Sequence, residues 1–371
     1  MNRPNRQAML AALKDKKTSF SGREVDRSEV FQRIRDGNVI PIIGNSVYFE
    51  QIFGSPASDP AVDGLAESKS VNELLAEIWA QKVDYPLTDT FDLARVALYN
   101  RVVSDDSEHA KRRFLIFLKT ALLDMFAQDP EVAGAVDELR TRVNMLSFAD
   151  IVQELGVIAY ATPDEDPLRL LARLNLPVYV TTSYFDFLER AIIAEGRTPR
   201  TQVCFWSGED VNIAPEHHYD PNLIPSQTQP LVYHLFGLEK YPRTMVLSED
   251  DYMAFLVEVT RAPNPTSPVI PLYLAEAFRS KSLILLGYRL HDWDFRVIFR
   301  GVVKPGLTAL RSFGLILQVN PSQDGMGRQE QAQSYLKEYF QEADFKVEWG
   351  NVEQYIQNVW KEWSQWARGR A

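Results

Sequence analysis

The chain has 371 residues, of which 45% are hydrophobic and 24% charged, as is typical of a globular protein with one large domain or two smaller ones. Its formal net charge of −10 disfavours non-specific nucleic-acid binding, and its single cysteine, Cys204, excludes a disulfide framework and a zinc site made of several thiolates. No apolar run is long enough to span a membrane, and the N-terminal apolar stretch is too short for a signal peptide, so we expect a cytoplasmic protein.

The first predicted elements are a helix and a buried strand. Residues 28–37, SEVFQRIRDG, favour a helix with Ser28 as N-cap and Gly37 just past its end. Residues 38–44, NVIPIIG, are apolar on both faces, which is typical of a strand in a parallel sheet. Residues 71–144 carry apolar side chains at spacings of three and four with no convincing strand, and they predict a helical insertion.

Strands alternate with helices through the rest of the chain. Apolar runs predict strands at residues 177–182, 201–206, 231–237, 282–287, 312–320 and 345–349. Amphipathic stretches predict helices at residues 164–174, 184–196, 248–259, 291–301 and 352–366. Ser248 and Asp251 have the spacing of a capping box. The alternation predicts an α/β fold, a Rossmann-like parallel sheet with helices on both faces and a large helical insertion.

The pattern divides the chain into three parts. We expect a discontinuous Rossmann-type domain at residues 28–56 and 146–325, interrupted by a helical insertion at residues 57–145. Residues 326–371 are expected to form a C-terminal helical extension with a short strand. The Trp-rich stripe of the last helix is either core or a subunit interface.

Small and hydrogen-bonding residues follow the predicted strands, at the edge of the sheet where ligands of open α/β proteins bind. Those expected to contact a nucleotide are Gly44, Asn45, Ser46, Thr182, Asp186, Gly287, Tyr288 and Asn320. Gly44, Asn45 and Ser46 suit contact with a phosphate or a ribose. Gly287 and Tyr288 suit contact with an adenosine, and Asn320 suits contact with a ribose hydroxyl. Each also has a structural explanation: a βα turn, tight strand–helix packing, a favourable first-turn acid for Asp186, or an Asx turn for Asn320.

Four blocks of the sequence carry a resemblance. They read VIPIIGNSV, VYVTTSYFDFLERAI, LVYHLFG followed by VLSEDDYMAFL, and LLGYRLHDWDFR. In this order they resemble the sirtuin-like domains of bacterial anti-phage defence proteins. The resemblance implies a Rossmann-like fold with a helical insertion, NAD as substrate or ligand, and no zinc module. It also implies cleavage of NAD to nicotinamide and ADP-ribose, which starves an infected cell.

The chain departs from this family at its most important positions. The family's first loop reads Gly-Ala-Gly and then a hydroxyl residue, whereas Asn45 and Ser46 follow the first glycine here. The family's catalytic Asn falls on Ser183, and its catalytic His falls on Phe236. His234 lies two residues earlier, on the same strand face and roughly 7 Å away.

Two roles remain open for the residues at these positions. Ser183 could orient the attacking water and His234 could accept its proton, which is the catalytic pair that we expect of an active enzyme. Alternatively, Ser183 caps the following helix, and His234 is a buried strand residue bonded to a carbonyl.

Three functions follow from these roles. The first is an NAD glycohydrolase that acts as an anti-phage effector. The second is a catalytically inactive nucleotide-binding sensor or scaffold of a defence complex. The third is a subunit that forms a homo-oligomer or assembles with a partner ATPase or Argonaute-like protein, which the Trp-rich helix and the helical insertion would support.

Overall fold

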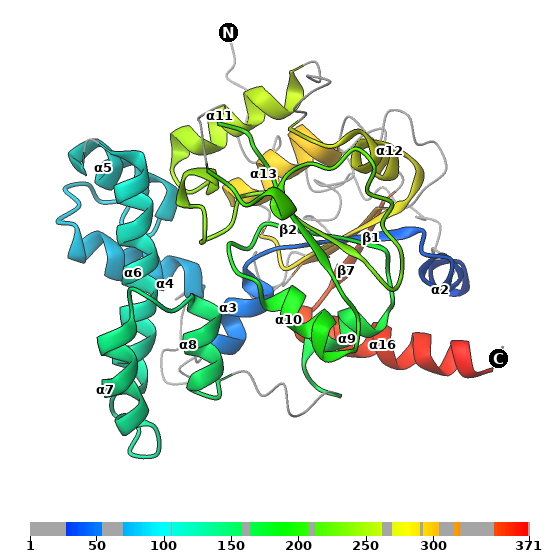
Figure 1. The fold of residues 1–371 in the computed structure, drawn as a ribbon, viewed down its shortest axis with the longest axis horizontal. Coiled ribbons are helices and arrows are strands. Elements are labelled where there is room, and N and C mark those ends of the chain that lie inside the picture. The colour runs from blue at the N-terminus through cyan, green and yellow to red at the C-terminus, as the bar shows by residue number, and fades with distance from the viewer. Residues whose placement is uncertain are drawn as a thin grey trace, which may run out of the picture.

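Among the residues described, seven strands form one parallel sheet at the centre of the molecule (Figure 1). The computed structural model describes residues 27–53, 70–104, 106–157, 164–207, 212–261, 269–289, 292–303, 315–319 and 345–369. The strands are β1 (Val39–Ile43), β2 (Val178–Thr181), β3 (Arg200–Val203), β4 (Leu231–His234), β5 (Ser282–Leu286), β6 (Leu315–Val319) and β7 (Phe345–Trp349). Their order across the sheet is β3-β4-β2-β1-β5-β6-β7, which confirms the predicted Rossmann-like α/β fold.

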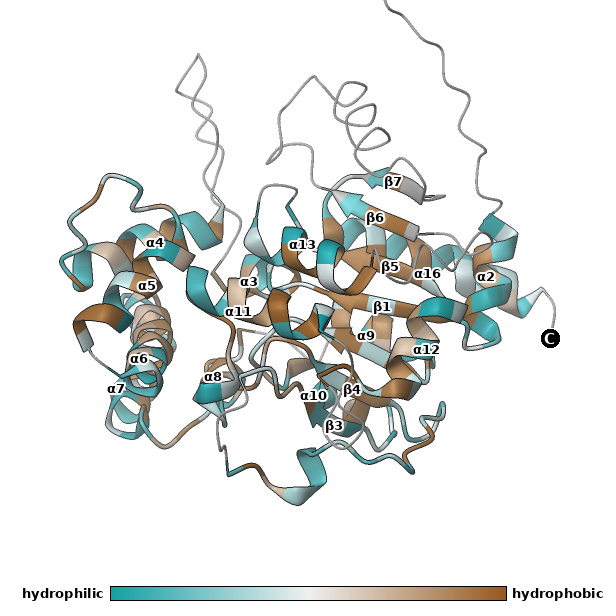
Figure 2. Cartoon of the chain, turned by 90° about the horizontal axis from the view of Figure 1, so that it is seen from above, coloured by the Kyte–Doolittle hydropathy of each residue, from teal (hydrophilic) through white to brown (hydrophobic). Residues whose placement is uncertain are grey.

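Helices cover both faces of the sheet, which is why the central strands are buried along their whole length (Figure 2). One face carries α9 (Pro167–Arg173), α10 (Phe187–Ala194) and α16 (Val352–Arg368). The other carries α11 (Glu249–Thr260), α12 (Leu272–Ser280) and α13 (Trp293–Ile298). For the helices that connect strands, this division follows from right-handed crossovers, because the chain crosses the sheet in one direction after β1 and in the other after β4.

A group of helices beside the sheet forms most of the segment expected as an insertion (Figure 1). Its members are α4 (Val71–Lys82), α5 (Leu93–Ser104), α6 (Ser107–Phe126) and α7 (Ala133–Arg142). Their apolar faces pack together, and the rings of Trp79 and Phe117 lie 4.7 Å apart. The remaining α-helices of the described ranges are α2 (Arg27–Arg35), α3 (Ser46–Phe53) and α8 (Phe148–Glu154). In the described part of the chain, no helix is both long and apolar enough to cross a membrane.

Local signals explain several element ends. The capping box expected at Ser248 is present, because Ser248 Oγ accepts from the Asp251 amide and the Asp251 carboxylate accepts from the Ser248 amide. The strand expected near the C-terminus is β7, and it is the edge strand of the main sheet, paired with β6. Strand β3 ends at Val203, three residues before the predicted end.

Candidate functional site

β1 and β5 are neighbours at the point where the chain reverses its direction across the sheet. From β1 the chain moves through β2 toward β3, whereas from β5 it moves through β6 toward β7. Ligands of open α/β sheets bind beyond the carboxyl ends of the strands at such a switch point. The first candidate site therefore lies where β1 ends at Ile43 and β5 ends at Leu286.

The loops after these two strands pack against each other so closely that glycine is required in both. The Gly44 amide donates to the Leu286 carbonyl at 2.8 Å, and Ser46 Oγ donates to the Gly287 carbonyl at 2.5 Å. A Cβ atom on Gly44 would lie 2.6 Å from the Gly287 carbonyl oxygen. Gly287 itself has φ +73°, a conformation that side-chain-bearing residues rarely adopt.

Thr182 and Tyr288 complete this cluster. The Tyr288 hydroxyl lies 3.3 Å from Thr182 Oγ1, and both side chains are buried. The structure thus brings together six of the eight residues expected to contact a nucleotide: Gly44, Asn45, Ser46, Thr182, Gly287 and Tyr288. Asp186 lies apart from them, beside a separate cavity, and Asn320 lies outside the described residues.

Asn45 gives this site an unsatisfied acceptor. Its Oδ1 atom is buried and has no hydrogen-bond partner within the described residues. Its main-chain carbonyl accepts from the amides of Tyr48 and Phe49 in the first turns of α3. The first turn of α3, which is fully described, contains no acidic side chain to oppose an anion. A buried acceptor beside a helix N-terminus fits a ligand that carries both hydroxyl and phosphate groups.

Ser183 is fully buried at the end of β2. Its Oγ accepts from the Phe185 amide at 3.3 Å, and its own amide donates to Thr181 Oγ1 at 3.0 Å. These bonds shape the turn between β2 and α10. The hydroxyl therefore serves the local backbone and has no exposed surface from which it could orient a water molecule.

His234 is also fully buried, and both of its ring nitrogens face acceptors. Nδ1 donates to the Ser183 carbonyl at 2.9 Å, and Nε2 lies 2.8 Å from Glu189 Oε1. Burial lowers the pKa of His234, but the Glu189 carboxylate and the Ser183 carbonyl outweigh burial and raise the pKa above its ordinary value. Both ring nitrogens are engaged by these two acceptors, so neither is available to accept a proton from a bound water.

Phe236 occupies the position at which the resemblance places a catalytic histidine. Its ring is fully buried and packs edge-on against Tyr252, at 5.5 Å, and Phe255, at 5.2 Å. Gly237 follows with φ +87°, and a Cβ atom there would lie 2.3 Å from the Thr244 carbonyl oxygen. The end of β4 is thus directed into the core between the sheet and α11.

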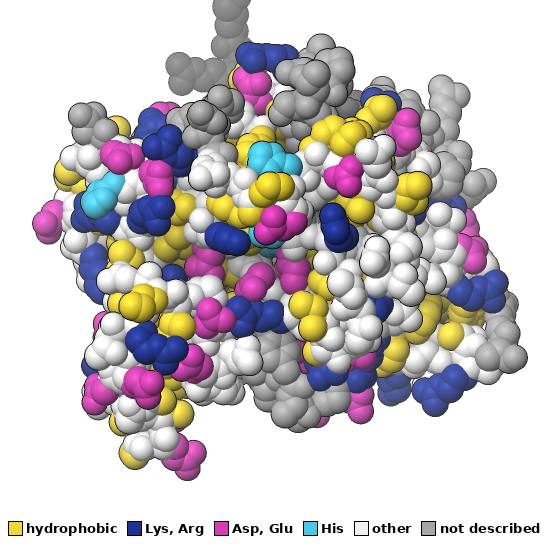
Figure 3. Space-filling model, in the orientation of Figure 1, with side chains coloured by type: hydrophobic (Ala, Val, Ile, Leu, Met, Phe, Trp, Pro, Cys, Tyr) yellow, Lys and Arg dark blue, Asp and Glu magenta, His cyan; other side chains and the backbone are white. Residues whose placement is uncertain are grey.

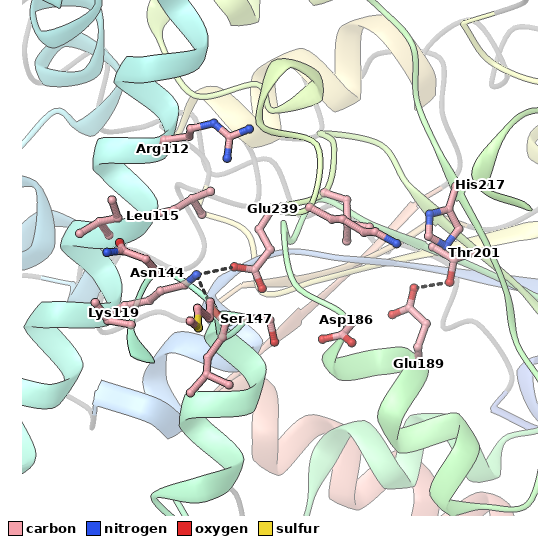
Figure 4. A pocket seen from close by; sticks show the side chains of 16 residues that line it. Arg112, Leu115, Lys119, Asn144, Ser147, Asp186, Glu189, Thr201, His217 and Glu239 are labelled. Atoms are coloured by element: carbon pink, nitrogen blue, oxygen red, sulfur yellow. Dashed lines mark hydrogen bonds and ion pairs between the residues drawn. The ribbon is translucent and has the colours of Figure 1, made fainter. Parts of the chain in front are cut away.

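A separate cavity of about 660 Å³ lies between α6, the segment before α8, and the loop after β4 (Figure 4). Asp186 and Glu189 reach it from the start of α10, and Glu239 faces them from the loop after β4. Acidic side chains border a hollow on this face of the molecule (Figure 3). Burial raises the pKa of Glu239 to about 7, although Lys119, whose Nζ lies 3.5 Å from Glu239 Oε2, lowers it.

Sequence reasoning missed the charged residues that line this cavity other than Asp186, among them Lys119, Glu189 and Glu239. Lys119 interrupts an apolar helical run in LIFLKTALL, and a lone lysine on such a face was an available signal. Glu189 stands within the DFLE block in the first turn of α10, but its partner His234 is 45 residues away. Glu239 had no comparable signal. No group of three His, Cys, Asp or Glu side chains in the described ranges could hold a metal ion.

Comparison with known families supports the fold assignment. Residues 177–343, from just before β2 to just before β7, match a family model described as a SIR2-like domain. A search of curated proteins finds no matching relative.

Proposed function

The chain carries a SIR2-like domain, a kind of domain that binds NAD, and from this premise we propose that it binds NAD beyond β1 and β5 without cleaving it. The proposed role is that of a nucleotide-binding sensor or scaffold in a bacterial defence complex. The N-terminus of α3 and Asn45 would contact the diphosphate and ribose groups of NAD. Gly44 and Gly287 carry no side chain, so the backbones of the two loops can pack closely at this site.

The burial of Ser183 and Phe236, the two positions that the resemblance assigns to catalysis, carries this proposal. Release of nicotinamide requires a water held near the anomeric carbon and a base that accepts its proton. Ser183 Oγ is bonded to the backbone of its own turn, and Phe236 has no titratable group. His234 is held as one partner of a buried ion pair with Glu189.

A second candidate function is NAD hydrolysis by Ser183 and His234. The observation that favours it is their contact, because the His234 ring lies 2.9 Å from the Ser183 carbonyl oxygen. Hydrolysis would require the ring to leave that carbonyl and present a nitrogen to a bound water. Such a rearrangement would break both hydrogen bonds of a fully buried side chain, which is why binding without turnover is the better-supported function.

The proposed binding site predicts the effect of Asn45→Asp. The substitution preserves shape and adds a negative charge at the start of α3, where an acid favours the helix but repels a phosphate. We expect the Kd for NAD to rise at least about tenfold, or about 1.4 kcal/mol, and the variant to keep a cooperative thermal transition. Isothermal titration calorimetry measures the first quantity and differential scanning fluorimetry the second.

Asn38→Asp is the matched control, because Asn38 is exposed and precedes the opposite end of the same strand, β1. It adds the same charge away from the proposed site and should leave the Kd unchanged. Equal affinity of NAD for Asn45→Asp and the unaltered protein would place the nucleotide elsewhere.

A further inference from the structure

The main chain at Gly287 lies directly against the start of α3 in the proposed nucleotide site. The Gly287 carbonyl accepts from Ser46 Oγ, and a Cβ atom on Gly287 would lie 2.6 Å from Val47 Cγ2. Ser46 and Val47 are the first two residues of α3, whose N-terminus is proposed to contact the diphosphate. A rotation of the Gly287 peptide would therefore displace the start of α3.

A side chain from the neighbouring strand β6 holds the Gly287 amide. Gln318 is 1% exposed, and its Oε1 atom accepts from the Gly287 amide at 3.2 Å. Its Nε2 atom donates to the Gly350 carbonyl at 2.6 Å. The two preceding strand residues, Ile316 and Leu317, are apolar and buried. A buried carboxamide in such a strand costs free energy unless its polar atoms are bonded, and here both ends bond to main-chain groups.

The position of β6 explains how one side chain reaches two loops. β6 lies between β5 and β7 in the sheet, and Gln318 bonds to the residue that follows each of these neighbours (Figure 2). After β7, Gly350 is followed by Asn351, whose Oδ1 atom accepts from amides in the first turn of α16. Asn351 Nδ2 also donates to Glu50 Oε2 on α3, at 3.5 Å. The turn before α16 is thus bonded to the Gly287 loop through Gln318 and to α3 through Asn351.

We infer that Gln318 is a positioning residue of the proposed nucleotide site, which holds the Gly287 peptide against the start of α3 and anchors this loop to the turn before α16. This inference rests on the proposed function, because its consequence is measured as NAD affinity. Gln318 acts through Gly287 and does not touch the nucleotide, since both polar atoms of its side chain are bonded to the main chain of the protein.

Gln318→Met tests this role, because methionine has a similar length but leaves the Gly287 amide and the Gly350 carbonyl without this partner. The groups of a binding site must be held within about 0.5 Å of their productive positions, so a small shift of the Gly287 loop weakens binding. We expect the Kd for NAD to rise at least about tenfold at unchanged stoichiometry, in calorimetry well below the thermal transition of the variant. Loss of folded protein would instead lower the stoichiometry.

Gln202→Met is the matched control. Gln202 is 2% exposed on β3, an edge strand separated from β1 by β4 and β2, and its Oε1 atom accepts from the Tyr273 hydroxyl. The substitution makes the same chemical change to a buried strand glutamine away from the proposed site, and it should change the Kd less than about twofold.

Gln318→Asn provides a second variant should Gln318→Met fail to fold. It keeps the amide but is one methylene too short to reach both loops, and it should raise the Kd for NAD at least about threefold. If the unaltered protein binds NAD and the Gln318 variants bind it as tightly as Gln202→Met does, Gln318 has no positioning role and the proposed function stands. If the unaltered protein does not bind NAD, the proposed function fails and this inference fails with it.

Discussion

Replacing His234 with alanine is expected to lower the free energy of unfolding by about 3–5 kcal/mol at pH 6, as measured by urea denaturation. The reason is the buried pair, in which His234 Nε2 lies 2.8 Å from Glu189 Oε1 and neither residue is appreciably exposed. Removing the ring leaves the Glu189 carboxylate buried beside an empty space. A catalytic base in an accessible active site would not carry a stability cost of this size.

His217→Ala is the matched control for this prediction. His217 is partly buried, and its Nδ1 atom pairs only with the Tyr241 hydroxyl among the hydrogen bonds described, at 2.9 Å. Loss of a neutral hydrogen bond of this kind costs about 1 kcal/mol. If His234→Ala costs no more than His217→Ala, the buried ion pair does not exist and the catalytic role of His234 regains support.

The same pair gives His234 a defined pH dependence. The folded-state pKa of His234 is raised, so its stabilising contribution is complete below its unfolded value and is lost as pH rises through the folded value. Burial raises the pKa of Glu189, but His234 outweighs burial and lowers it, so the contribution of Glu189 is lost only at acid pH. The stability advantage over His234→Ala should therefore be largest near pH 6 and decline as pH rises through the raised folded-state pKa of His234.

Gly237→Ala is expected to destabilise the protein by about 3 kcal/mol or more. Gly237 has φ +87°, and a Cβ atom would lie 2.3 Å from the Thr244 carbonyl oxygen, a backbone atom that cannot move aside cheaply. Its neighbours in the turn are fixed, since the Val246 amide donates to the Phe236 carbonyl at 3.0 Å. Thermal and urea denaturation should both report the loss.

Gly196→Ala separates the effect of backbone conformation from that of the clash. Gly196 has a similar φ of +77°, but a Cβ atom there would meet nothing within 4 Å. Alanine at this position should cost only about 1–2 kcal/mol, the penalty of the left-handed conformation itself. Equal costs at the two glycines would mean that the turn after β4 yields to the extra atom.

The features that the sequence predicts well are local or periodic. Sequence runs that are apolar on both strand faces predicted β1 and β5, and the Ser248–Asp251 spacing predicted the start of α11. The cluster of Gly44 and Gly287 was predictable because the carboxyl ends of parallel strands share one edge of the sheet.

The features that the sequence did not predict depend on long-range partners. Glu189 and His234 belong to different elements, and only the register of the folded sheet brings them together. Lys119 meets Glu239 across 120 residues of chain because the helical group packs beside the loop after β4. The residue type alone therefore suggested that His234 is a catalytic base, whereas in the folded protein His234 is buried and pairs with Glu189.

The most direct test of binding without turnover is to incubate the purified protein with NAD and measure both quantities in the same sample. Calorimetry reports NAD binding, and chromatography reports free nicotinamide. We expect saturable NAD binding that Asn45→Asp weakens, with nicotinamide no higher than in a protein-free control. Nicotinamide release that Ser183→Ala abolishes would contradict the account and establish the hydrolase instead.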